Sequence, residues 1–333
     1  MTTVMLVGTG AVGARAARQL TDTAGIERVL IVERRKSHAD VVAAAMGARA
    51  EVLEWTADSP VPDGVAAVAC ALPAGAEQPI ASRAVEAGVP FASSGDDEHD
   101  LMGLRSLTEP ARRAGITVLA GCGLAPGLSD VLARHAADAF DEVDEIGVAR
   151  AGTAGDACIA TAGRALRGGC AELRDGVYDE SRRRGGHELV WFPEPIGPRE
   201  CERVATGVQL LSGAVPDADR ITVRLARDDT GARKRWLGRR DPEGSWGAVR
   251  VEVWGRRGAA REPIVYGAIE RTAIAAGTVL AVTTAALAGA LPGLLAPSAG
   301  VFGLGGVAQP RAFLEELSRR GVKAAIFEGV PVA

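Results

Sequence analysis

The stretch Val4-Met5-Leu6-Val7-Gly8-Thr9-Gly10-Ala11-Val12-Gly13 decides the fold. A short apolar run ends in a G-x-G-x-x-G turn, and a helical pattern begins directly after it. Such a turn brings the backbone close to a pyrophosphate and directs a helix N-terminus at it. A second apolar run, Val29-Leu30-Ile31-Val32, leads into Glu33, twenty residues after Gly13. At this spacing a carboxylate meets the adenosine ribose of a dinucleotide. The predicted cofactor-binding residues here are Gly8, Thr9, Gly10, Ala11, Val12, Gly13 and Glu33; a glycine turn without a ligand is the alternative.

The residues after the second run bear on cofactor choice. Glu33 favours the free ribose hydroxyls of NAD, because a carboxylate would repel a 2′-phosphate. The cations Arg34, Arg35 and Lys36 could instead bind that phosphate, or could form a solvated turn. We expect NAD rather than NADP, with Arg34 and Arg35 beside the ribose, and dual use stays open.

Composition limits the possible functions. A chain of 333 residues with 47% hydrophobic residues predicts two globular domains. The net charge of −4 gives no reason to expect nucleic acid as a partner. Five cysteines without C-x-x-C spacing argue against a disulfide framework or a metal site. Since no signal peptide precedes the first apolar run, we expect a cytoplasmic protein.

One uncharged segment requires a membrane test. Residues 272–310 carry no charge, and 272–291 is long enough to span a bilayer. The run is rich in Ala, Gly and Thr, which favour insertion weakly. We therefore expect no membrane contact, and a helix buried between domains or in a homodimer.

Strand and helix patterns alternate through the first third of the chain. Strands are expected at 4–7, 29–32, 50–53, 65–72, 89–92 and 116–119, and helices at 38–46, 77–87 and 100–114. Regular alternation implies an α/β fold with a doubly wound parallel sheet. We assign residues 1–122 to a dinucleotide-binding Rossmann domain.

The pattern changes after this domain. A helix is expected at 128–140, followed by strands at 143–150, 171–178, 188–192, 220–226, 249–254 and 263–267. In the fifth of these, Val249, Val251 and Val253 alternate with Arg250 and Glu252, which indicates a sheet with one solvated face. Residues 123–267 are therefore expected to form a mixed α+β substrate or dimerisation domain. Helices at 268–291 and 309–319 complete a C-terminal segment, 268–333.

Three loops at strand ends should form the site, since ligands of doubly wound sheets bind beyond the carboxyl ends of the strands. Leu72 and Pro73 should lie near the cofactor, and Ser94 and Gly95 near both cofactor and substrate. The loop 121–127 is glycine-rich, and its amides could hold a substrate carboxylate or a cofactor carboxamide. Asp96, Asp97 and Asp130 in or after these loops could instead only cap helices.

Candidates for proton transfer are few. Histidine is a common acid or base in catalysis and Asp97 precedes His99 by two residues, so we consider both catalytic; an exposed histidine without a role is the alternative. The arginine clusters at 182–184 and 233–240 are either solvated loops or a lid that brings an arginine to a substrate carboxylate.

The chain resembles the saccharopine dehydrogenase-like NAD(P)-dependent reductases. The resemblance rests on GTGAVG, on VACALPAGAEQPIASRAVEAGVPFASSGDD, on AGCGLAPGLSD and on the C-terminal FLEELSRRGV, and covers about the first 140 and last 70 residues. It implies a Rossmann domain, a mixed-sheet substrate domain and a C-terminal segment that packs back on the first domain. Relatives interconvert secondary amines and imines and often carry Asp before the Pro-Gly, where this chain has Ala125.

The resulting hypothesis is an enzyme, an NAD(P)-dependent oxidoreductase acting on a C–N bond of a small amino acid, amine or imine between the domains. Ser94, Gly123, Pro126 and Gly127 would position the substrate, and His99 or Asp97 would handle the proton. One alternative is an NAD-using enzyme without net redox, such as a cyclodeaminase. Another is a dinucleotide-binding sensor or scaffold without catalysis.

Overall fold

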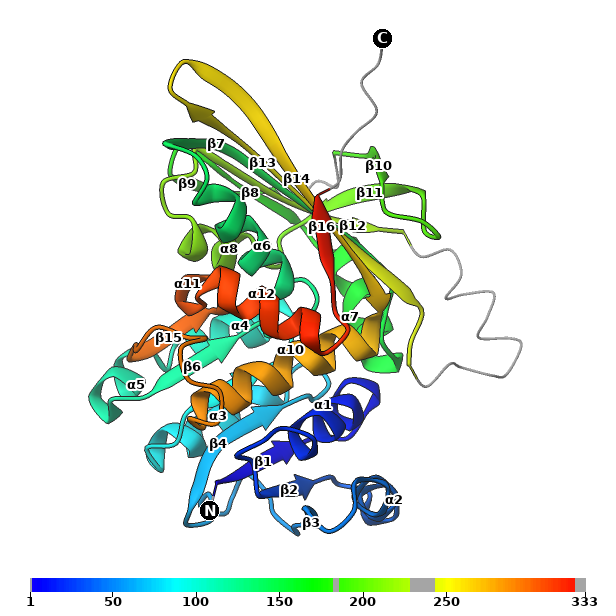
Figure 1. Cartoon of the computed structure of the whole chain (residues 1–333), viewed down its shortest axis with the longest axis vertical. Coiled ribbons are helices and arrows are strands. Elements are labelled where there is room, and N and C mark those ends of the chain that lie inside the picture. Colours follow the sequence, from blue (N-terminus) through cyan, green and yellow to red (C-terminus); the bar gives the residue numbers. More distant parts are fainter. Residues whose placement is uncertain (1, 182–185, 228–242, 327–333) are drawn as a thin grey trace.

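The computed structural model describes residues 2–181, 186–227 and 243–326 and contains two sheets stacked one above the other (Figure 1). The lower sheet is parallel, with the strand order β15, β6, β5, β4, β1, β2, β3. These strands are Gly300–Gly303, Thr117–Ala120, Phe91–Ser93, Val65–Cys70, Thr3–Val7, Arg28–Val32 and Ala50–Val52. The predicted doubly wound Rossmann sheet is thus confirmed, and a seventh strand joins it from near the C-terminus.

Helices cover both faces of this sheet, which explains why its strands are continuously apolar. Val4 and Leu6 of β1 pack in one core with α1 (Ala11–Thr21), α2 (Lys36–Met46) and α10 (Thr272–Leu287). Met5 and Val7 point the other way, into a core with α3 (Glu77–Glu86), α4 (Glu98–Arg105) and α5 (Thr108–Ala114). The N-terminus of α1 and the loops after β4, β5 and β6 therefore meet at one edge.

The upper sheet is mixed, with the order β10, β11, β12, β7, β13, β14, β16 and a hairpin β8–β9 beside β12. These strands are Glu188–Trp191, Pro198–Val204, Arg220–Ala226, Glu142–Ala151, Trp246–Arg257, Ala260–Arg271 and Ala324–Ile326, with Cys170–Arg174 and Val177–Ser181 in the hairpin. β12 and β7 are parallel, whereas β7 and β13 are antiparallel. The alternation in β13 is confirmed, since Val249, Val251 and Val253 are buried and Arg250 and Glu252 are half-buried.

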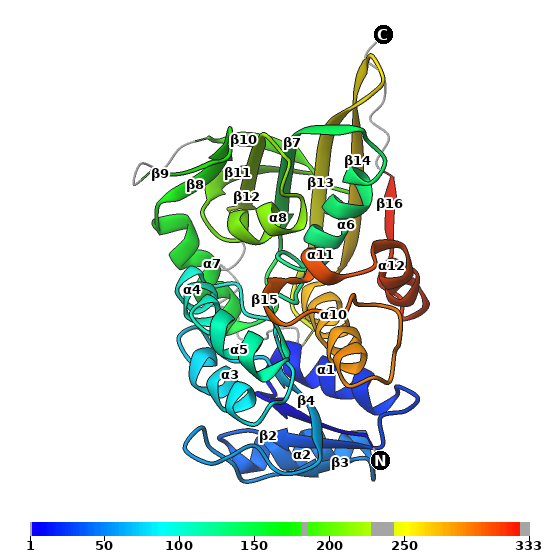
Figure 2. The ribbon, with the colours of Figure 1, turned by 90° about the vertical axis from the view of Figure 1, so that its left-hand side faces the viewer.

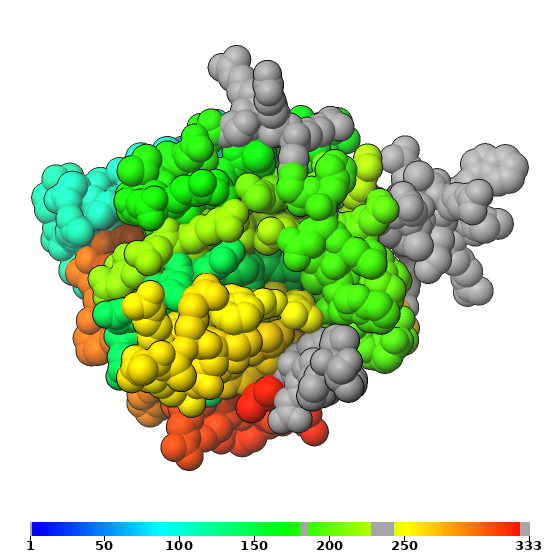
Figure 3. Space-filling view, turned by 90° about the horizontal axis from the view of Figure 1, so that it is seen from above, coloured from blue at the N-terminus to red at the C-terminus, as the bar shows by residue number. Residues whose placement is uncertain are grey.

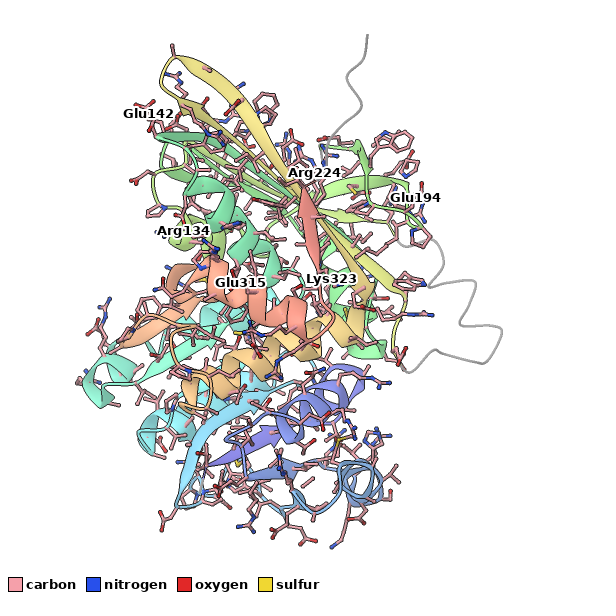
Figure 4. The ribbon with its side chains drawn as sticks, in the orientation of Figure 1. Arg134, Glu142, Glu194, Arg224, Glu315 and Lys323 are labelled. Carbon is pink, nitrogen blue, oxygen red and sulfur yellow. The ribbon has the colours of Figure 1, made fainter. Side chains whose placement is uncertain are left out.

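The inner face of the upper sheet packs on α6 (Leu128–Ala137) and α8 (Val208–Ala214). Arg134 of α6, labelled in Figure 4, donates to the carbonyl of Ala214 at the end of α8 (Nη1–O 3.1 Å). The outer face, seen from above in Figure 3, consists of the green and yellow segments of the sheet itself. The upper sheet thus turns only one face to the rest of the molecule.

The C-terminal part of the chain connects the two sheets. α10 follows β14, β15 enters the lower sheet, and α11 (Leu304–Val307) and α12 (Pro310–Arg319) lead to β16 in the upper one. Figure 2 shows α10, α11 and α12 between the sheets. α10 is buried along most of its length, and none of the described helices is long and apolar enough to cross a membrane.

Several expected elements differ from the structure. The helix expected at 100–114 is two helices, α4 and α5, because Pro110 has no amide hydrogen and fits the first turn of a new helix. The strand expected at 171–178 is the hairpin β8–β9, since Asp175 (φ 51°) and Gly176 (φ 74°) form its two-residue turn. The helix expected from 268 begins at Thr272, because β14 still pairs with β13 up to Arg271.

Six elements were not anticipated: α7 (Asp156–Arg167), α8, β11, β15, α11 and β16. Only Thr161 and Ala162 of α7 are buried, although the sequence of this helix is amphipathic. The arginine clusters at 182–184 and 233–240 lie outside the described residues.

Candidate functional site

The three glycines of the loop after β1 have different surroundings. Gly8 has φ +92°, a conformation that side chains rarely adopt, and a Cβ there would collide with the carbonyl of Ala71. A Cβ on Gly13 would collide with the carbonyl of Gly8. A Cβ on Gly10, by contrast, would meet nothing within 4 Å. Gly10 is also the N-cap of α1, and no side chain caps the helix there. The loop therefore offers the close approach and the open helix N-terminus that a pyrophosphate requires.

Glu33 is fixed against this loop. Its Oε2 accepts hydrogen bonds from the Thr9 amide (3.1 Å) and the Thr9 hydroxyl (3.0 Å), and its Oε1 accepts one from the Arg35 amide (3.2 Å). Partial burial alone would raise the pKa of Glu33, but these hydrogen bonds lower it on balance. The carboxylate is therefore charged and oriented at the place where a ribose would bind.

A cavity of about 1060 Å³ extends from this loop into the space between the two sheets. Its size lies at the upper end of the range of about 300–1,000 Å³ for ligand sites. The cavity is lined by most of the residues expected to bind cofactor and substrate: Gly8, Gly10, Ala11, Val12, Glu33, Arg34, Arg35, Leu72, Pro73, Ser94, Gly95, Asp97, Gly123 and Pro126. The remaining expected residues, Thr9, Gly13, His99 and Gly127, do not line it.

Arg34 and Arg35 are exposed along the cofactor end of the cavity. Lys36 turns away from it and forms an ion pair with Glu54 (2.6 Å). Of the three cations after Glu33, two thus remain in reach of a ligand.

A buried ion pair joins the two domains inside the cavity. Arg150 at the end of β7 bonds through Nη1 to Asp96 Oδ2 (2.6 Å) and to the carbonyl of Ala125 (2.8 Å). The side chains of Arg150 and Asp96 are only 10% and 16% exposed. Cys158 of α7 lines the same part of the cavity, and burial, followed by the charge of Asp96, raises the pKa of its thiol. The sequence did not point to Arg150; its place at the end of a predicted strand was the available signal.

Asp97 lies beside this pair and has two roles. Its Oδ1 accepts a hydrogen bond from the His99 amide (3.1 Å) as the N-cap of α4, and its Oδ2 pairs with Arg164 of α7 (3.1 Å). His99 itself is exposed. Of these two residues, only Asp97 lines the cavity.

The loop between β6 and α6 lines the part of the cavity where we expect the substrate to bind. The Gly123 amide donates to the carbonyl of Pro126 (3.0 Å), which closes a tight turn. A Cβ on Gly127 (φ +125°) would collide with the Gly123 backbone, so Gly127 is required by the turn itself. Gly123, Leu124, Ala125 and Pro126 are the residues of this loop that line the cavity.

Two fully buried acids lie below these loops. Burial raises the pKa of Glu77 in α3 to about 8 and that of Asp130 in α6 to about 7. Neither lines the cavity. Among the described residues no group of three or more His, Cys, Asp or Glu side chains could hold a metal ion.

Comparisons with known proteins concern the fold. No family model matches the sequence, and no curated protein is similar to it. The structure is similar to apo saccharopine dehydrogenase (L-Glu forming) from Saccharomyces cerevisiae, with a TM-score of 0.69 and 14% identity over 98% of this chain and 100% of that one. It is also similar to an amine dehydrogenase from Mycobacterium smegmatis, with a TM-score of 0.53 and 12% identity over 93% and 97% of the two chains. A DAP dehydrogenase of C. glutamicum, solved with DAP, gives a TM-score of 0.50 and 13% identity over 96% and 98%. From one end of the chain to the other, this protein therefore has the two-domain fold of saccharopine dehydrogenase.

Proposed function

We propose that this protein is an NAD(P)-dependent oxidoreductase that acts on a C–N bond of a small amino-acid-like substrate. The observation that carries the proposal is the continuous cavity from Gly10 and Glu33 to the Asp96–Arg150 pair. The similar proteins of known structure are dehydrogenases by name, one of amines and one solved with DAP. A bound dinucleotide would supply or accept the hydride.

The residues of this chain would bind and orient the reactants. The Gly8–Gly13 loop would hold the pyrophosphate and Glu33 the ribose. Arg34 and Arg35 would be able to bind a 2′-phosphate, if the dinucleotide carries one. We favour NAD because the Glu33 carboxylate is charged and fixed at the ribose position. Comparison of the dissociation constants of NADH and NADPH tests this preference, and much tighter binding of NADPH would contradict it.

Polar groups at the substrate end suit an amino acid. Within the described part of the chain, Arg150 contacts Asp96 and the carbonyl of Ala125 through Nη1. Its other nitrogens can therefore donate hydrogen bonds to a substrate carboxylate. Ser94 and the Gly123–Pro126 turn line the same space. We propose that the carboxylate of Asp97 accepts a proton from the substrate amine. A general base must lie within reach of the substrate, and Asp97 lines the cavity.

Asp97→Asn tests this role. Asparagine caps a helix as well as aspartate does, so α4 should be preserved while the charge is lost. We expect kcat to fall by about 10² or more, with NADH affinity unchanged, and His99→Ala to retain activity. Equal activity of Asp97→Asn and the wild type would exclude Asp97 as the base.

The reaction class is tested by following NAD(P)H absorbance with a panel of keto acids and amines, and of amino acids with NAD(P). Stoichiometric change in cofactor supports the proposal. Product without net absorbance change would favour a reaction without net redox. Tight cofactor binding without turnover would favour a sensor, a reading supported by the lack of Lys, His or Tyr among the described cavity residues. A cytoplasmic location and a homodimer both remain predictions. Light scattering would test the homodimer.

A further inference from the structure

Glu77 lies directly behind the loop that separates β5 from α4. It is the first residue of α3 and is 0% exposed. Gly95 of the loop lines the cavity on one side, and a Cβ on its other side would lie 2.5 Å from both carboxyl oxygens of Glu77. The carboxyl group thus occupies the space in which a side chain of residue 95 would stand.

A short chain of hydrogen bonds ties Glu77 to the loop. The Ser93 hydroxyl donates to Glu77 Oε2, and the Gly95 amide donates to the Ser93 hydroxyl oxygen (2.9 Å). Both the proton and an acceptor position of that hydroxyl are therefore in use. These hydrogen bonds fix the backbone from Ser93 to Gly95 relative to Glu77.

The other oxygen, Glu77 Oε1, is buried and has no hydrogen-bond partner in the described part of the chain. A charged oxygen in that position would be costly, because it would lack both water and a donor. Protonation at Oε1 removes the charge, which is the larger part of this cost, and leaves Oε2 as the acceptor for Ser93. The geometry thus fits a neutral carboxylic acid.

The charges around Glu77 act in the same direction. Asp100 of α4 and Asp96 and Asp97 of the loop disfavour its ionisation. The thiols of Cys70 in β4 and Cys122 after β6 also interact with it. Burial, together with these carboxylates, raises the pKa of Glu77 to about 8.

We propose that Glu77, as a neutral acid, is a positioning residue that holds the Ser93–Asp97 loop against the cofactor cavity, and that its ionisation weakens dinucleotide binding. The inference rests on the proposed function insofar as the ligand is a dinucleotide. It assigns no contact with the ligand to Glu77, which acts through Ser93 and Gly95. The same loop carries Asp96 and Asp97, so its position also sets the substrate end of the site.

The test is the pH dependence of NADH binding, followed by fluorescence between pH 6.5 and 9.5. If only the neutral form binds, the apparent dissociation constant of the wild type rises about tenfold between pH 7 and pH 9. Glu77→Gln keeps an acceptor for Ser93 but cannot ionise, so its affinity should remain constant where that of the wild type falls. Glu77→Ala loses the acceptor and should bind weakly at all pH values.

Asp130→Asn is the matched control, because Asp130 is a second fully buried acid below a different loop. It should retain the wild-type rise in the dissociation constant above pH 8. The same rise in Glu77→Gln as in the wild type would overturn the proposal.

A separate measurement distinguishes failure of the inference from failure of the proposed function. If no variant binds NADH or NADPH, amide hydrogen exchange of the ligand-free protein decides. Protection of the Gly95 amide, corrected for intrinsic exchange, should fall with rising pH in the wild type and not in Glu77→Gln. Equal behaviour of the two proteins would refute the positioning role regardless of any cofactor.

Discussion

At the scale of single residues, we expect Gly10 of the glycine-rich loop to be required for ligand binding and Gly13 to be required for folding. Gly10 faces open space in the cavity, whereas Gly13 touches the backbone of Gly8. The same substitution at these two positions should therefore act on different properties. Local spacing in the sequence predicts both glycines but does not say which of them the ligand needs.

We expect Gly10→Ala to keep the melting temperature within a few degrees and to weaken NADH binding tenfold or more, because its methyl group would occupy the pyrophosphate position. Gly13→Ala should destabilise the protein by about 1–3 kcal/mol, since α1 must move away from the loop. Thermal unfolding and NADH titration of both variants check this. Unfolding of Gly10→Ala, or full stability of Gly13→Ala, would contradict the assignment.

The sequence predicts those parts of the site that depend on near neighbours. The G-x-G-x-x-G turn, Glu33 and the strand-end loops follow from short motifs, and the structure brings most of them to one cavity. Arg150 and Glu77 could not be predicted in the same way. Arg150 gains its role from Asp96, more than fifty positions earlier, and Glu77 gains its role from Ser93, sixteen positions later in another element.

At the scale of elements, α10 shows why a long uncharged run need not be a membrane segment. Its small residues let α1 approach closely: a Cβ on Gly277 would lie 2.6 Å from the Cβ of Arg15 and 2.8 Å from the carbonyl of Val12. The composition of the run predicts burial, as found, but not the partner helix. That partner follows from the return of the chain to the lower sheet after β14.

Gly277→Ala should therefore cost about 1–3 kcal/mol of unfolding free energy, despite the higher helix propensity of alanine. Gly213 of α8 provides the control, because a Cβ there would meet nothing within 4 Å. Gly213→Ala should be neutral or should stabilise by up to about 1 kcal/mol. Chemical denaturation of the two variants measures the difference. Equal stability would mean that α1 and α10 pack less tightly than the structure shows.

Strands that are buried on both faces are predictable from their continuous apolar runs, whereas elements placed by contacts between distant polar residues are not. The core strands β1, β2 and β4 lie within a few residues of their predicted positions because they are buried on both faces. Few residues of α7 are buried, so its position depends on contacts such as that of Arg164 with Asp97, which the sequence does not reveal. Asp175-Gly176 is a hairpin signal in the sequence, although the strand expected at 171–178 runs across it.

At the scale of the whole molecule, the chain passes from the lower sheet to the upper one, back through α10 and β15, and again to the upper sheet in β16. The two domains are therefore joined by more than one connection. One contact that links them inside the cavity is the Asp96–Arg150 pair, which belongs both to the site and to the domain interface. Its substitution should thus reveal whether the domains are fixed relative to each other by the site itself.

Asp96→Asn should lower the unfolding free energy by about 3–5 kcal/mol, because it leaves the buried guanidinium of Arg150 without a counter-charge. Asp96→Asn combined with Arg150→Met removes both charges and keeps an apolar side chain of similar length, so most of that loss should be recovered. Arg164→Ala is the control: Arg164 is 47% exposed and pairs with Asp97 in water, so its loss should cost at most about 1 kcal/mol. Calorimetric unfolding of the four proteins gives the comparison. If Asp96→Asn and Arg164→Ala lose equally little, the pair does not hold the domains together.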